Sequence, residues 1–310
     1  MTDIPTLRLL LDLVAPAFFD MTALAALGAP LLAVAGLTVA STRASALPDK
    51  LAQQLTRMGA LLAVLSAVAT AAVWQMGTAR WPGLFADLRH WLDQAGSAPA
   101  YALWTVGLFM ALSVLSTALN RPLLRRRPLR LCLALATAVA AVGAVLACLN
   151  TAGRFVRHLG LDRGDVPLDP RALAWPVLAD SLALALACAA TLGLAYLVLR
   201  RNKDDFGRDY YRYALGRAGT WAAAGLGLHV GCLAWLLAAL PQSTRDFVLA
   251  QAMPLVLAVT CLSLAAAALC LVLARAKSPL RLKALAFVAA LLLWAEHTCL
   301  SAMFLLAFAG

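Results

Sequence analysis

The chain has 310 residues, of which 63% are hydrophobic and only 13% charged, and its formal net charge is +11. This composition excludes an ordinary soluble globule, because long charge-poor segments recur along the chain. Nucleic-acid binding is also disfavoured, since the basic residues do not form an aromatic-studded domain. Eight segments can each cross about 30 Å of hydrocarbon as a helix of about 20 residues, and they are 17–40, 57–77, 99–119, 129–149, 174–199, 218–240, 252–274 and 284–308.

Helices are required in these segments because a lipid-facing strand edge or coil would leave backbone groups without hydrogen bonds. The predicted fold class is therefore an all-α polytopic membrane protein with eight transmembrane helices. Residues 1–16 place leucines on one helical face and Arg8 and Asp12 on another. This pattern predicts an interfacial lead-in or an extension of the first helix.

The distribution of Lys and Arg predicts the orientation. The connections after the first, third, fifth and seventh spans hold 18 of these residues, and the opposite side, both termini included, holds 8. The positive-inside rule places the richer side in the cytoplasm and both chain ends outside. We expect a multi-pass protein of the bacterial inner (cytoplasmic) membrane, in contact with the lipid bilayer.

Three connecting segments carry patterns of their own. Residues 80–93 alternate apolar and charged residues at helical spacing, which predicts an amphipathic helix on the outer surface. Residues 151–173 are polar and mixed in sign, as in an exposed outer loop. The inner loop 200–217 interleaves basic residues with tyrosines, which is typical of a segment facing lipid headgroups or a docking surface.

The chain repeats itself. A shift of 160 positions brings Pro16 onto Pro176 and Asp20 onto Asp180, and Pro128-Leu129-Arg130-Leu131 recurs as Pro279-Leu280-Arg281-Leu282. We interpret these matches as two parallel four-helix units, 17–150 and 174–310, related by an axis along the membrane normal. The alternative is coincidence in an Ala- and Leu-rich sequence.

Glu296 and His297 are the first candidates for a functional site. They stand side by side in an otherwise apolar span, where the first unit has Val145 and Leu146. Ionisable groups at this depth need a buried partner, a ligand or a water-lined cavity. Four further polar residues of the spans are supporting candidates: Asp20, Gln75, Asp180 and His229.

Each supporting candidate also has a structural interpretation. Asp20 and Asp180 can bond free amides at a helix start or face surface water. Gln75 can form an interhelical hydrogen bond. His229 lies between Gly227 and Gly231, so a neighbouring backbone or a flat ring can approach it closely.

Two chemistries fit these residues. In the first, a quinone lies between helices and exchanges protons with Glu296 or a histidine. In the second, His229 and His297 are the axial ligands of a single b-type haem. The seven cysteines lie inside predicted spans without the spacing of metal ligands, so no other metal is expected.

The layout of eight helices, outer termini and two four-helix halves resembles the DmsC/NrfD-type membrane anchor subunits of molybdenum and iron–sulfur respiratory oxidoreductases. Three short runs carry the local likeness: Gln75-Met76-Gly77, Trp175-Pro176 and Ala295-Glu296. Gln75 stands where the family has its quinol-site histidine, a glutamate near the start of the third helix is replaced by Tyr101 or a neighbour, and Leu300 stands where an arginine is expected. The resemblance implies quinone (menaquinone or ubiquinone) as substrate, no haem, and iron–sulfur or molybdopterin subunits as partners.

The function expected from the sequence is an integral membrane anchor subunit of a respiratory electron-transfer complex that interacts with quinone or quinol in its outer half. The alternatives are a single-haem cytochrome b subunit, a non-redox structural scaffold and a transporter. The chain has no nucleophile triad, phosphate loop or metal-binding motif, so we expect it to contribute to an oxidoreductase complex and to catalyse nothing alone.

Overall fold

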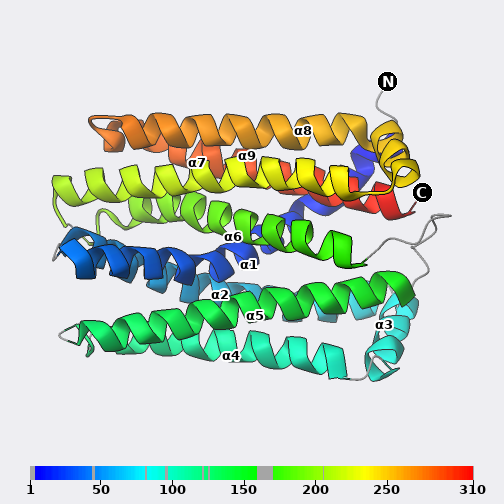
Figure 1. Cartoon of the computed structure of the whole chain (residues 1–310), viewed down its shortest axis with the longest axis horizontal. Helices are drawn as coiled ribbons and strands as arrows, with labels where there is room; N and C mark the ends of the chain where they lie inside the picture. The colour runs from blue at the N-terminus through cyan, green and yellow to red at the C-terminus, as the bar shows by residue number, and fades with distance from the viewer. Residues whose placement is uncertain are drawn as a thin grey trace.

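The computed structural model describes residues 4–43, 46–80, 82–94, 97–120, 122–124, 126–158, 170–204 and 206–309, and within these ranges it is helical with no strand (Figure 1). Eight of the described helices are long and apolar enough to cross a membrane, which confirms the predicted number of spans. The elements are α1 Ile4–Arg43, α2 Ala46–Arg80, α3 Pro82–Gln94, α4 Ser97–Leu119, α5 Arg127–His158, α6 Pro170–Arg200, α7 Arg208–Ala239, α8 Gln242–Arg275, the 3₁₀ turn η1 Pro279–Leu282 and α9 Lys283–Ala309.

The spanning helices lie side by side along the long axis of the molecule, and both chain ends lie at the same end of the bundle (Figure 1). We call this the terminal end and the other the distal end. The short helix α3 packs against α2 at the terminal end. Trp81 of the expected amphipathic helix 80–93 lies outside the described residues, and so do residues 159–169 of the expected outer loop 151–173.

Helices α1 and α6 lie at the centre of the bundle. Helix α1 contacts α2, α5, α6 and α9, and α6 packs most extensively against α7 and α1. The close approach of α1 to α6 depends on Gly28, because a Cβ atom there would overlap the carbonyl oxygen of Ala185. Small residues at such a contact are the usual means of bringing membrane helices together.

Helix α1 is also tied to α9 by side chains. The indole Nε1–H of Trp294 donates a hydrogen bond of 2.7 Å to the carbonyl oxygen of Val14. The same indole packs edge-on against Phe18. These contacts fix α9 against α1 within one turn of Glu296.

The basic segment 200–217 differs from its predicted form. Helix α7 begins at Arg208, so half of the expected loop is helical. Tyr210 and Tyr211 are only 1% and 2% exposed and pack into the bundle, whereas Arg208 and Arg212 of the same segment are exposed. Gly207, whose φ is +84°, reverses the chain just before α7, and the ring of Phe206 then packs edge-on against Tyr210.

Candidate functional site

A chain of hydrogen bonds links three spanning helices in the interior of the bundle. Asp180 on α6 bonds His229 on α7 through Oδ1 and Nδ1 at 2.7 Å. The Nε2 atom of His229 lies 3.1 Å from Oε1 of Glu296 on α9, and Oε2 of Glu296 lies 2.9 Å from Nδ1 of His297. We refer to Asp180, His229, Glu296 and His297 as the polar chain.

The polar chain is shielded from the surroundings. His229 and Glu296 are completely buried, and His297 and Asp180 are 1% and 7% exposed. Charged groups removed from water are tolerated only when each has partners, and here every carboxylate faces an imidazole. His229 lies between two carboxyl groups, which accept but do not donate when ionised. Either the ring is doubly protonated or one of these carboxyls holds a proton, so the chain contains a proton that can move.

One end of the polar chain is open. The Nε2 atom of His297 is buried and has no hydrogen-bond partner among the described residues. Its nearest carboxylate oxygen is Oδ2 of Asp20 on α1, at 3.8 Å, and the Asp20 side chain is 62% exposed. This separation is too long for a hydrogen bond, so both atoms can bind a third group.

A cavity of about 410 Å³ lies in front of this open end. Its polar wall includes Asp20, Asp180 and His297, whereas leucine, valine and alanine side chains of α1, α4, α5, α6 and α9 make up most of the remainder. His229 and Glu296 do not line it and lie behind this wall. The volume falls within the range of small-molecule sites, about 300–1,000 Å³, and an apolar wall with a few convergent polar groups is typical of them.

A second cavity, of about 280 Å³, adjoins the first. The two share Val177, Leu236 and Phe304 in their walls. Thr260 contributes the one polar side chain to the described wall of the second cavity, which is otherwise aliphatic and aromatic. The first cavity thus has polar groups in its wall, and its neighbour across these three residues is almost entirely apolar.

The structure brings together five of the six candidate residues and leaves one apart. Gln75 is exposed near the terminal end of α2 and does not line the cavity. Asp180 lies ten residues inside α6 and bonds His229, so the expectation that it bonds free amides at a helix start is wrong. Gly227 and Gly231 are exposed with open space beside them, and neither brings a neighbour toward His229.

The geometry bears on the haem hypothesis. Both ring nitrogens of His229 lie within hydrogen-bond distance of carboxylate oxygens, and Glu296 bridges His229 to His297. An axial ligand needs a nitrogen lone pair directed at the iron, and two axial ligands must face each other across the haem. His229 and His297 have no such arrangement, so these two residues do not fit the axial ligation of a haem.

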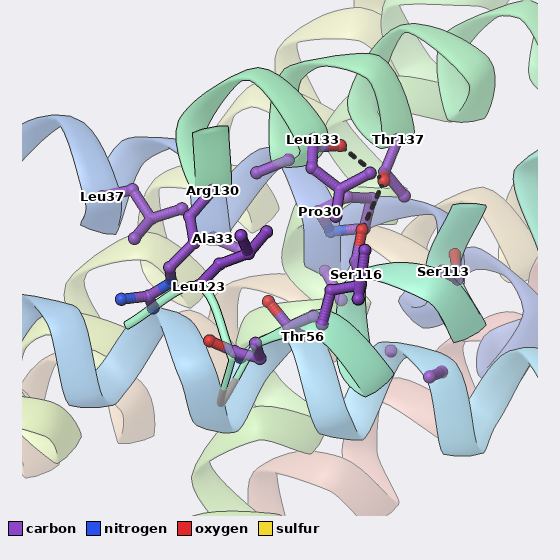
Figure 2. Close-up of a pocket in the computed structure, with 16 residues that line it drawn as sticks. Pro30, Ala33, Leu37, Thr56, Ser113, Ser116, Leu123, Arg130, Leu133 and Thr137 are labelled. Atoms are coloured by element: carbon purple, nitrogen blue, oxygen red, sulfur yellow. Dashed lines mark hydrogen bonds between the residues drawn. The ribbon is translucent and has the colours of Figure 1, made fainter. Parts of the chain in front are cut away.

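A different polar pocket lies between α1, α2, α4 and α5, toward the distal end (Figure 2). Ser116 and Thr137 face each other there with hydroxyls 2.8 Å apart (Figure 2). Arg130 also lines the pocket, and its Nη1 donates to Oδ1 of Asp49, outside the lining, at 2.8 Å. The pocket holds about 30 Å³, the space of one water molecule. It is therefore a packing feature of the first four spans. Of its lining residues, Arg130 belongs to the Pro-Leu-Arg-Leu run of the predicted repeat.

The chain matches no family model, and comparisons with curated proteins and with solved structures give no match. The interpretation of the site therefore depends on its own geometry and chemistry.

Proposed function

We propose that the protein is an integral membrane anchor subunit of a respiratory electron-transfer complex and that it binds quinone or quinol in the 410 Å³ cavity. The observation that carries the proposal is the unbonded, buried Nε2 atom of His297, which lies at the wall of an amphiphilic cavity and is backed by the polar chain. A buried polar atom without a partner is costly, and a ligand oxygen that bonds it removes this cost.

The two adjoining cavities match the two parts of a quinone. The ring oxygens need hydrogen-bonding groups, which His297 and Asp20 supply. The isoprenoid tail needs an apolar surface, which the 280 Å³ cavity supplies next to Phe304 and Leu236. Menaquinone and ubiquinone both meet these requirements.

The polar chain gives this site a way to move protons. When a quinol is oxidised it releases two protons and two electrons. His297 Nε2 accepts a hydroxyl proton, and the proton on Nδ1 passes to Glu296 and onward through His229 to Asp180. Asp20, beside the cavity, accepts the other proton. In such a complex the iron–sulfur clusters of the partner subunit would take up the two electrons, and for quinone reduction the same residues of this chain would return the protons.

The same proposal includes the predicted orientation and repeat. We place the distal end, which holds most of the Lys and Arg residues, in the cytoplasm of a bacterial cell and the chain ends outside. The helices α1, α2, α4 and α5 form one unit and α6 to α9 the other. An iron–sulfur or molybdopterin subunit is the expected partner.

A binding experiment tests the proposal. The purified full-length protein is titrated with short-tailed ubiquinone and menaquinone analogues, and the dissociation constant is measured for the parent, for His297→Gln and for Gln75→Ala. We expect His297→Gln to weaken binding roughly tenfold or more, as for loss of a hydrogen bond to a buried group. Gln75→Ala is the control, because Gln75 is exposed and outside the cavity. Equal affinities in all three proteins would contradict the proposal, and a Soret band in the parent would support the haem alternative.

A further inference from the structure

A cationic cleft lies at the distal end of the bundle, where the connection between α6 and α7 meets the connection between α8 and α9. Its volume is about 310 Å³. Five of its ten lining residues are basic: Arg201, Arg208, Arg212, Lys277 and Arg281. No described carboxylate lines it. We call this set of residues the basic cleft.

The basic residues of the cleft form no ion pair with a carboxylate among the described residues. The ion pairs at the distal end are Arg130 with Asp49 and Arg200 with Asp204, and neither includes a basic residue of the cleft. Asp204 is further engaged by Nε2 of Gln54 at 3.0 Å. Five like charges around one concavity repel one another, and an anion bound among them relieves that repulsion.

The backbone adds to the attraction for an anion. Helix α7 begins at Arg208, at the edge of the cleft, and the one acidic residue of its first turn, Asp209, is exposed and does not line the cleft. The amide groups of a helix N-terminus point outward and carry partial positive charge. Nη2 of Arg208 lies 3.3 Å from Oγ of Ser278 and holds the two connections together. The basic cleft is thus closed on two sides by chain segments that are fixed to each other.

The position of the basic cleft limits the kind of anion that it can bind. The cleft lies where the membrane-spanning helices end, which is the depth of lipid headgroups. Part of its wall is apolar, with Pro279 buried and Leu280 partly buried. Basic pockets between transmembrane helices at this depth suit phospholipid headgroups, and arginine binds phosphate oxygens through two parallel hydrogen bonds.

We propose that the basic cleft binds the phosphodiester headgroup of an anionic phospholipid. This site is separate from the quinone cavity, because the two share no lining residue. Free inorganic phosphate has the same recognition chemistry, but it lacks the acyl chains that extend along the apolar side. A bound lipid at this position ties the α6–α7 connection to the start of α9.

The test uses the purified full-length protein in uncharged detergent micelles. Short-chain phosphatidylglycerol, short-chain phosphatidylcholine and inorganic phosphate are titrated separately, and the thermal unfolding midpoint gives each affinity through its dependence on concentration. The variant is the double substitution Arg208→Gln and Arg281→Gln. The matched control is Arg126→Gln with Arg127→Gln, which removes the same charge from exposed residues of the distal end outside the cleft.

We expect phosphatidylglycerol to raise the midpoint of the parent and of the control double variant, and phosphatidylcholine to leave both unchanged. In the cleft variant, the affinity for phosphatidylglycerol should fall roughly tenfold to thirtyfold, as for the loss of two basic contacts at a membrane surface. An equal fall in the control variant would overturn the proposal, because the effect would then be one of net charge. Inorganic phosphate that stabilises the parent as strongly as the lipid would also overturn it, because the occupant would be a soluble anion.

Discussion

Arg130 near the start of α5 and Asp49 near the start of α2 form an ion pair in which Arg130 is 5% and Asp49 20% exposed, whereas Asp180 and His229 form a buried pair inside α6 and α7. Arg130 of the first pair lines a pocket that holds only about 30 Å³. The polar chain instead opens through His297 onto a cavity of about 410 Å³. Burial of ionisable groups is common to both regions, so burial alone does not mark a ligand site. What distinguishes the polar chain is the larger cavity beside it.

The positions related by the predicted repeat sharpen this contrast. Arg281, at the place of Arg130, is exposed and lines the basic cleft. Val145, at the place of Glu296, is buried on α5 and lines the 410 Å³ cavity. Positions that the predicted repeat relates therefore carry charges in different surroundings, and substitutions at them should have different effects on stability.

The largest loss of unfolding free energy is expected for Glu296→Leu. This change leaves Nε2 of His229 and Nδ1 of His297 buried without an acceptor. Breaking a buried charge network from one side costs about 3–5 kcal/mol of unfolding free energy. The free energy is measured by denaturant titration in mixed micelles, with Glu296→Gln as the control, since the amide oxygen keeps one acceptor. A loss of less than about 1 kcal/mol in Glu296→Leu would show that the polar chain is not a coupled unit.

The next largest loss of unfolding free energy is expected for Arg130→Met, and Arg281→Met is its comparison. Arg130 is 5% exposed and its partner Asp49 is 20% exposed, so the substitution leaves a carboxylate with little water. We expect Arg130→Met to lower the unfolding free energy by about 2–3 kcal/mol, and Arg281→Met, at the related but exposed position, by less than about 0.5 kcal/mol. Similar losses at both sites, measured in the same titration, would mean that the two halves use this arginine alike.

A smaller effect is expected at the contact between the two halves. Gly28→Ala places a methyl group against the backbone of Ala185, which cannot move as a side chain does. Overpacking of this kind costs about 1–3 kcal/mol. Gly107→Ala is the matched control, because a Cβ atom there meets nothing within 4 Å. If both variants melt at the same temperature, α1 and α6 do not depend on close contact at Gly28.

The sequence predicted the number of spans and five of the residues that meet at the site. The spans could be predicted because the length of an apolar segment is a property of the local sequence. Glu296 and His297 were conspicuous because charge is rare in such helices. The hydrogen-bond partners of each group could not be predicted from the sequence. The bonds of His229 to Asp180 and Glu296 depend on how three helices are rotated about their axes. Gln75 has the same polarity as its fellow candidates but lies on an exposed part of α2.

The smallest effect concerns a tie between the halves at the distal end, where Gln54 of α2 and Arg200 of α6 both donate to Asp204. Burial acts to raise the pKa of Asp204, but these hydrogen bonds outweigh it and lower the pKa below its ordinary value. A carboxyl whose pKa is lower in the folded state stabilises the fold above its unfolded pKa of about 3.9 and loses this contribution as the pH falls through the folded value.

Asp204→Asn should therefore lower the unfolding free energy by about 1 kcal/mol at neutral pH. The difference from the parent should begin to shrink below about pH 4 and disappear once the pH is below the lowered folded pKa, where the parent carboxyl is also uncharged. Thermal unfolding of both proteins across this pH range measures it, and a difference that stays constant to the lowest pH would mean that the charge of Asp204 contributes nothing to the tie.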